Sequence, residues 1–200
     1  MTVRVMVVSP AMSAALREAR FDGDVALDEA GARRARSAAG ALPRADRRLV
    51  GTSARCAETA AELGLRAGEP EPALGSWDMG RWRGRRLEEV SASEPDAVST
   101  WLTDPLAAPH GGESLLALCD RVGNWLESLP GDTGDVLAVA EPAAVRAAIV
   151  RALALPVEAF WRLDVAPLTL TELSGRSGRW NLRCGRPLGP EANDPSNRAS

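Results

Sequence analysis

The sequence is poor in the residue types that bind metals or form disulfide frameworks. It has no lysine, no tyrosine, one histidine and three cysteines in 200 residues. Cys56, Cys119 and Cys184 are far apart and form no CxxC pattern, so we expect reduced and mostly buried thiols. With one histidine and no cysteine cluster, a zinc site would need an unusual all-oxygen set of ligands. We therefore expect neither a metal nor a cofactor.

A strong charge of one sign and a long apolar run are also missing. The net charge is −3, with both signs interspersed, which excludes the basic surface that nucleic acids or anionic membranes require. The opening apolar run, Val3–Val8, is too short and too β-branched for a signal peptide or a membrane span. We expect a cytoplasmic protein with a small-molecule partner, and a homodimer stays open.

What is present indicates one folded domain. With 45% hydrophobic residues, the chain can bury one core but not two comfortable ones. We predict a single domain over residues 1–184, followed by a disordered tail rich in Pro, Gly and Asn over residues 185–200. Short apolar runs at residues 3–8, 49–50 and 136–140 predict buried strands. Helical patterns alternate with them, which predicts an α/β three-layer sandwich with a mostly parallel central sheet and helices on both faces.

Helix signals and one long loop complete the predicted order of elements. Asp28 is a candidate N-cap for a helix reaching about residue 42, and Pro142 begins another helix. Apolar residues at helical spacing predict the longest helix over residues 115–129. Residues 65–84, rich in Gly, Pro and Trp, predict a loop, and loops of this length are usually functional or disordered. Residues 168–182 have the pattern of two strands around a Ser/Gly turn.

Five short segments, taken together, carry a family resemblance through their order and spacing. They are residues 27–31, 55–60, 77–84, 111–114 and 143–147. In this order and at these spacings they resemble the histidine phosphatase superfamily, the phosphoglycerate-mutase-like enzymes. The resemblance covers about residues 3–183 and implies that family's fold. It also implies that Arg55 is one of the side chains that grip phosphate in the family.

The departures from the family pattern all fall at its active-site positions. The family ends its first strand with Arg-His-Gly, where the histidine takes the phosphoryl group, and this chain has Ser9-Pro10-Ala11. A second histidine follows the third strand in the family, and here Glu141 takes its place. The family's acid for the leaving group lies four residues before a motif glycine, where this chain has Ser76. The resemblance thus implies a degenerate member that lacks both catalytic histidines.

These departures predict that the family's phosphatase or mutase mechanism is lost. Pro10 has no nucleophilic atom. The motif positions supply one arginine, Arg55, and one carboxylate, Glu141, so their charges sum to about zero. A phosphate about 4 Å from Glu141 would meet repulsion of about 4 kcal/mol per charge pair at an effective dielectric near 20.

The remaining polar groups predict a different activity. Ser9 and Glu141 follow predicted parallel strands, so both should face the crevice where such sheets bind ligands. We predict that Glu141 is a general base and that His110 assists it, in a proton abstraction leading to cyclisation, isomerisation or elimination of a small metabolite, as in bacterial secondary metabolism. The alternatives are a catalytically inactive pseudo-phosphatase that binds a ligand or regulates, and a residual phosphatase that uses water. His110 could also simply be exposed.

A set of polar and aromatic residues is predicted to bind the substrate. Serine hydroxyls could orient a neutral polar ligand or could be ordinary loop residues, and tryptophan could stack on an apolar substrate. The predicted substrate-binding residues are Ser9, Arg20, Phe21, Arg55, Ser76 and Trp77. We expect Trp82 to pack its loop against the core, and we expect core or interface positions for Trp101, Trp125, Trp161 and Trp180.

Overall fold

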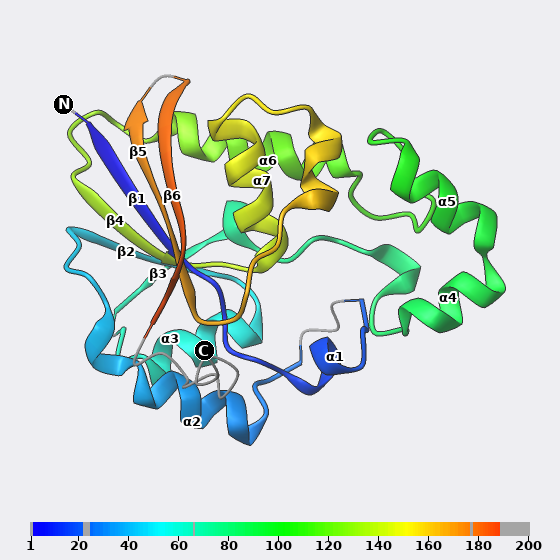
Figure 1. Cartoon of the computed structure of the whole chain (residues 1–200), viewed down its shortest axis with the longest axis horizontal. Coiled ribbons are helices and arrows are strands. Elements are labelled where there is room, and N and C mark those ends of the chain that lie inside the picture. The colour runs from blue at the N-terminus through cyan, green and yellow to red at the C-terminus, as the bar shows by residue number, and fades with distance from the viewer. Residues whose placement is uncertain (1, 22–24, 66, 177, 189–200) are drawn as a thin grey trace, which may run out of the picture.

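The computed structural model describes residues 2–21, 25–65, 67–176 and 178–188. A six-stranded sheet runs through its centre in the order β3-β2-β4-β1-β5-β6 (Figure 1). The strands are β1 Val3–Val8, β2 Arg47–Gly51, β3 Glu69–Glu71, β4 Asp135–Val139, β5 Thr169–Arg176 and β6 Arg179–Pro187. The first four strands in this order are parallel, while β5 and β6 are antiparallel to their neighbours. The predicted α/β fold with a mostly parallel sheet is confirmed.

Helices cover both faces of the sheet, as Figure 1 shows. One face carries α2 (Glu29–Ser37) and α3 (Ala54–Glu62), and the other carries α6 (Leu115–Ser128) and α7 (Pro142–Ala152). The strand β1 contributes side chains to both cores, because its successive side chains point to opposite faces of the sheet. Val5 and Val7 pack toward α6 and α7, while Met6 and Val8 pack toward α2 and α3.

Shorter elements complete the chain. The helices α4 and α5 extend away from the sheet at the right of Figure 1. The bounds are α1 Ala14–Arg17, α4 Leu87–Ser93 and α5 Pro95–Thr103, with 3-10 turns η1 Ala39–Ala41, η2 Pro72–Leu74, η3 Gly80–Trp82 and η4 Val157–Arg162. Within the described ranges, we find no helix with the length and apolar character that crossing a membrane requires.

Two helices begin where the sequence predicts. The Asp28 carboxylate accepts a hydrogen bond from the Gly31 N–H at 2.7 Å, which caps α2, and Pro142 is the first residue of α7. The helix α2 ends at Ser37, earlier than predicted, and the 3-10 turn η1 follows it.

Two boundaries differ from the prediction. Residues 65–84 contain β3 and two 3-10 turns, and β3 escapes pattern analysis because its sequence is Glu-Pro-Glu. The predicted tail begins too early, because β6 continues to Pro187, which pairs with Thr169. The buried Leu188 then donates its N–H to the Leu168 carbonyl at 2.9 Å. The rest of the predicted tail, residues 189–200, lies outside the described residues.

The contact between two glycine-rich loops gives a stability test. Gly80 and Gly84 both have positive φ, +47° and +77°, but a Cβ on Gly80 would lie 2.2 Å from the His110 carbonyl oxygen, whereas a Cβ on Gly84 meets nothing within 4 Å. Both alanine variants carry the backbone strain, and only Gly80→Ala adds a clash with backbone. We expect Gly80→Ala to lower the free energy of unfolding by at least about 1 kcal/mol more than Gly84→Ala, measured by chemical denaturation. Equal losses would contradict the loop contact.

Candidate functional site

Two helix starts meet at the carboxyl ends of β2 and β4. The chain leaves β2 and enters α3, whose N-cap Ser53 accepts a hydrogen bond from the Cys56 N–H at 3.1 Å. It leaves β4 and enters α7, whose N-cap position is Glu141. Because β2 and β4 are parallel neighbours, the two helix starts lie side by side at one edge of the sheet. Arg55 lies in the first turn of α3 and faces Glu141.

Arg55 and Glu141 form a buried, two-pronged ion pair. The Arg55 Nη2 binds Glu141 Oε2, and Arg55 Nε donates to Oε1 at 3.3 Å. Ser53 Oγ also donates to Oε1, at 2.7 Å. The two charged side chains are only 12% and 7% exposed. Removing one partner of such a pair typically destabilises a protein by about 3–5 kcal/mol, because the other charge stays buried and unpaired.

The nearby thiol of Cys56 is not a substitute nucleophile. Burial raises the pKa of the Cys56 thiol well above its usual range, and the negative charge of Glu141 raises it further. The thiol therefore stays protonated at neutral pH, and a protonated thiol is a poor nucleophile.

A cavity of about 270 Å³ opens against the ion pair, and we call it the Glu141 cavity. Its charged lining residues are three arginines, Arg20, Arg55 and Arg146, and one carboxylate, Glu141. Its other lining residues are Ala15, Leu16, Phe21, Trp77, Met79, Trp101, Pro142, Ala143, Phe160 and Trp161. The predicted balance of one arginine against one carboxylate is therefore wrong, because the fold adds two arginines that the motif positions did not reveal.

Arg146 is a half-buried cation with incomplete pairing. Its guanidinium carbon lies 5.7 Å from the centre of the Phe160 ring, and its Nε is buried without a hydrogen-bond partner among the described residues. Its ion pair with Asp164 is long, at 4.0 Å, and the Asp164 side chain is 99% exposed. Burial lowers the pKa of Arg146, and Asp164 opposes that shift. A buried donor without a partner favours a ligand that can accept its hydrogen bond.

Arg20 stands at the rim and already has protein partners. Its Nε donates to the Glu18 carboxylate at 2.7 Å, and its Nη1 donates to the Gly84 carbonyl at 3.0 Å. Hydrogen bonds from Arg20 and Arg86 lower the pKa of Glu18. The charge of Arg20 is thus partly balanced, which leaves Arg146 as the arginine best placed to meet a ligand.

Aromatic rings form the rest of the wall. Five rings line the Glu141 cavity: Phe21, Trp77, Trp101, Phe160 and Trp161. Neighbouring rings pack with their centres 4.7 to 5.8 Å apart, in tilted and edge-to-face arrangements. Trp77 is held in place because its Nε1 donates to the Glu113 carbonyl at 2.7 Å. Trp101 lies in the core and Trp161 packs against it, as predicted, but both also line the Glu141 cavity, and Trp82 is fully buried as predicted.

Two of the predicted substrate-binding residues lie elsewhere. Ser9 is buried, and its hydroxyl donates to the Ala166 carbonyl at 2.5 Å, so it serves the connection to β5 and does not line the Glu141 cavity. Ser76 lines a second cavity, of about 590 Å³. The two cavities share the wall formed by Trp77 and Met79. The structure therefore has two cavities in place of the predicted single crevice, and Ser9 lines neither of them.

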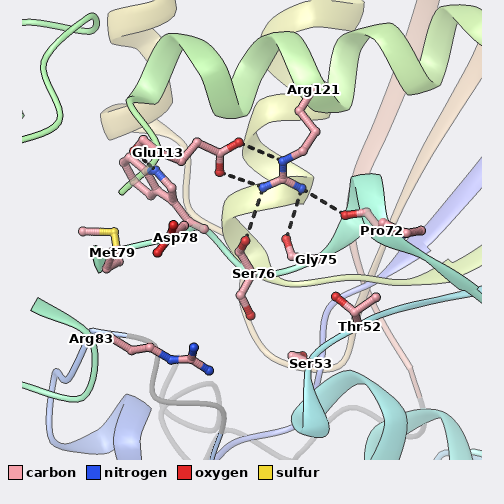
Figure 2. Close-up of a pocket in the computed structure, with 11 residues that line it drawn as sticks. Thr52, Ser53, Pro72, Gly75, Ser76, Asp78, Met79, Arg83, Glu113 and Arg121 are labelled. Atoms are coloured by element: carbon pink, nitrogen blue, oxygen red, sulfur yellow. Dashed lines mark hydrogen bonds and ion pairs between the residues drawn. The ribbon is translucent and has the colours of Figure 1, made fainter. Parts of the chain in front are cut away.

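Figure 2 shows how the second cavity is built. Arg121 of α6 lies across its top, where it binds the Glu113 carboxylate at 2.8 Å and donates a hydrogen bond to the Ser76 carbonyl at 3.3 Å. Arg83 reaches toward the space from the opposite side, in the same view. Arg121 thus fixes the loop that carries Ser76 and Trp77, and Glu113 also holds this loop because its carbonyl accepts the Trp77 Nε1 hydrogen bond. Among the described residues, no group of three His, Cys, Asp or Glu could hold a metal ion.

His110 lies apart from both cavities. Its side chain is buried, its Nδ1 accepts a hydrogen bond from the Gly112 N–H at 3.0 Å, and its ring centre lies 5.1 Å from that of Trp82. Burial lowers the pKa of His110, so the ring is neutral at pH 7. The structure thus supports neither an exposed histidine nor one that assists Glu141, because Trp82 and the Gly112 backbone occupy its surroundings.

The chain is similar in sequence and in structure to known proteins. The family model of the histidine phosphatase superfamily (branch 1) matches residues 13–185. A glucosyl-3-phosphoglycerate phosphatase of Mycolicibacterium vanbaalenii is 32% identical over 149 residues, which cover 68% of this chain and 66% of that protein. Another, of Mycobacterium tuberculosis, is 31% identical over 183 residues, which cover 80% and 82%. The solved structure of a mycobacterial glucosyl-3-phosphoglycerate phosphatase with VO3 aligns at a TM-score of 0.74 and 27% identity, covering 94% of this chain and 99% of that one.

These findings correct the predicted function. The similar proteins are phosphatases, which contradicts both the predicted proton abstraction in a cyclase, isomerase or lyase and the alternative of an inactive binding or regulatory module. The error arose from counting charges only at the positions of the family's catalytic side chains, a count that left out Arg146 and Arg20.

The burial of His110 gives a pH test of stability. Because its folded pKa is lowered below the ordinary value of about 6.5, the unfolded chain binds the proton first as pH falls. This contribution destabilises the fold progressively below about pH 6.5 and is absent above it. His110→Gln keeps an acceptor but does not titrate, so the wild type should lose more unfolding free energy between pH 7 and pH 5 than this variant. Parallel pH profiles from urea denaturation would show that His110 is not buried as described.

Proposed function

Because this chain belongs to the histidine phosphatase superfamily and three arginines line its cavity, we propose that it hydrolyses a phosphate monoester without the two catalytic histidines. The observation that carries the proposal is Arg146, whose half-buried guanidinium lies in the lining shared with Arg55 and whose buried Nε has no hydrogen-bond partner among the described residues. Arginine binds phosphate oxygens through paired, planar hydrogen bonds, so these two side chains suit a phosphoryl group.

The charge balance of the cavity supports an anionic substrate. Among its described lining residues, three guanidinium groups face one carboxylate, and although Glu18 partly balances Arg20, the excess positive charge favours a phosphate monoester dianion. Repulsion between Glu141 and the phosphate is still about 4 kcal/mol per charge pair at 4 Å and an effective dielectric near 20. Arg55 offsets it most directly, since its guanidinium is bonded to the Glu141 carboxylate, and Arg146 adds a second positive charge.

Water is the nucleophile in this proposal, since Pro10 takes the place that the resemblance gives to the nucleophilic histidine. The water oxygen forms a bond to phosphorus while the bond from phosphorus to the ester oxygen breaks. Glu141 orients the water and accepts its proton, and Arg55 and Arg146 stabilise the charge on the other phosphoryl oxygens. Positioning and electrostatics dominate such a reaction, because its transition state is loose.

Arg146 can be tested against a matched arginine on the same helix. Arg151 is also on α7 but pairs with Asp120 and lies outside the cavity lining. We expect Arg146→Met to lower kcat/KM for p-nitrophenyl phosphate by at least about 100-fold, the typical effect of removing one group that stabilises transition-state charge. Arg151→Met should stay within about twofold of the wild type. Equal losses in the two variants, or a wild type that releases no phosphate from any monoester, would contradict the proposal.

Glu141→Gln separates the two effects of the carboxylate. The amide keeps the shape and can still accept from Arg55, but it neither repels phosphate nor takes a proton. We expect inorganic phosphate to bind about tenfold more tightly, measured by calorimetry, because a repulsive charge is removed. Turnover should fall at least about 100-fold, the lower range for loss of a general base. If binding and turnover fall together in a variant that circular dichroism shows to be folded, Glu141 has neither role.

A further inference from the structure

The Glu141 cavity offers no proton to a leaving group. Its ionisable lining residues, among the described part of the chain, are three arginines and Glu141. Arginine does not act as a proton donor near neutral pH. Both Glu141 oxygens already accept hydrogen bonds from Arg55 or Ser53. Ser76, where the resemblance implies an acid, lines the second cavity, and the chain has no tyrosine. Glu141 takes its proton from the attacking water, on the side of phosphorus opposite the leaving oxygen, so we infer that the ester oxygen leaves as an anion.

This lack of an acid selects for one class of ester. A phenol has a pKa of about 10, whereas that of water is about 16, and aliphatic alcohols are similar to water. In the loose transition state of phosphoryl transfer, much negative charge develops on the leaving oxygen. A phenolate carries that charge without a proton, and an aliphatic alkoxide does not. The chemistry of the cavity thus favours aryl phosphates.

The shape and lining of the cavity point independently in the same direction. Its wall consists of five aromatic rings with Met79, and apart from the charged groups it has no hydroxyl or amide side chain among its lining residues. Sugar or glycerol hydroxyls placed against these rings would lose hydrogen bonds to water, and among the described lining side chains only the charged groups and the unpartnered Trp101 Nε1 could replace them. A flat ring, by contrast, can pack against Trp77, Trp101 and Trp161 in stacked and edge-to-face arrangements. The volume of about 270 Å³ suits a ring with its phosphate group.

We propose that the substrate is the phosphate monoester of a small phenolic or similar aromatic alcohol, an inference that rests on the hydrolysis proposed above. The ring lies against Trp77, Trp101 and Trp161, and the phosphate lies between Arg55 and Arg146. The ester bond from oxygen to phosphorus breaks, its electron pair leaves on the phenolate oxygen, and water supplies the new oxygen on phosphorus. The aryl phosphate dianion, water and the Glu141 carboxylate give a phenolate, hydrogen phosphate and protonated Glu141, which then returns its proton to the solvent, so atoms and charge balance.

Binding of two unreactive phosphonates tests the specificity without turnover. Phenylphosphonate and methylphosphonate present similar anionic groups and differ in the ring, and neither has an ester bond to hydrolyse. We expect the wild type to bind phenylphosphonate at least tenfold more tightly, measured by calorimetry. Trp161→Leu keeps an apolar side chain and should remove most of that preference while leaving methylphosphonate affinity unchanged. Trp180→Leu, which alters a buried tryptophan outside the cavity lining, should keep the preference.

The outcomes separate this inference from the proposed hydrolysis. Equal affinity for the two phosphonates overturns the aromatic specificity, and so does a Trp161→Leu variant that weakens both ligands equally. If Trp161→Leu does not fold, Phe21→Leu, at a half-buried lining position, takes its place. Faster release of phosphate from glycerol 1-phosphate than from phenyl phosphate overturns the specificity while hydrolysis stands. A retained phenyl preference without turnover of any ester overturns the hydrolysis while the specificity stands.

Discussion

The site depends on the buried ion pair between Arg55 and Glu141. It joins the first turn of α3 to the first turn of α7, and Ser53 adds a third contact from the N-cap of α3. Both helices start at carboxyl ends of parallel strands, so the pair fixes the floor of the Glu141 cavity relative to the sheet. A buried pair of this kind is not in itself a large source of stability, because desolvation of the charges opposes their attraction. Its effect is to hold one carboxylate and one guanidinium in a defined geometry.

The pairing determines what the other charges of the cavity can do. Since Arg55 binds the Glu141 carboxylate, the half-buried Arg146 is left without an equivalent partner among the described residues. Arg146 comes from the next turn of α7, and its one ion pair among the described residues is the long contact with the exposed Asp164. An anion that enters beside Arg146 would accept its hydrogen bonds and would also lie near the charge of Arg55. The aromatic wall, contributed by segments far apart in the sequence, then limits what can be attached to that anion.

Much of the fold could be predicted because it rests on local patterns. The β-branched runs gave the central strands, Asp28 and Pro142 gave two helix starts, and the order of the motif segments gave the family. β3 could not be predicted, since Glu-Pro-Glu has no apolar alternation and owes its place to pairing with β2. The end of β6 was also missed, because its Pro/Gly-rich sequence is ordered by β5.

The candidate site was predicted only in part. Glu141, Arg55, Trp77, Arg20 and Phe21 do line one cavity, and each followed a motif or lay in a loop beside one. Trp101 and Trp161 were missed because an aromatic residue at helical spacing has the same pattern in a core as in a cavity wall.

The positions of three other residues were not predicted, for different reasons. A signal for Arg146 was present, since it is the one charged residue in the apolar stretch of residues 142–150. Ser9 and His110 were misplaced because nearby backbone groups bind the Ser9 hydroxyl and the His110 Nδ1, contacts that no sequence pattern reveals.

The stereochemistry at phosphorus tests the central claim most directly. An aryl phosphate made chiral with three oxygen isotopes can be treated with the enzyme together with an acceptor alcohol that takes the phosphoryl group in place of water, and the configuration of the product ester read by phosphorus NMR. Direct attack by water, without a histidine nucleophile, transfers the phosphoryl group in one displacement and predicts inversion. Retention would mean two displacements through a covalent phosphoenzyme, and that result would contradict the account.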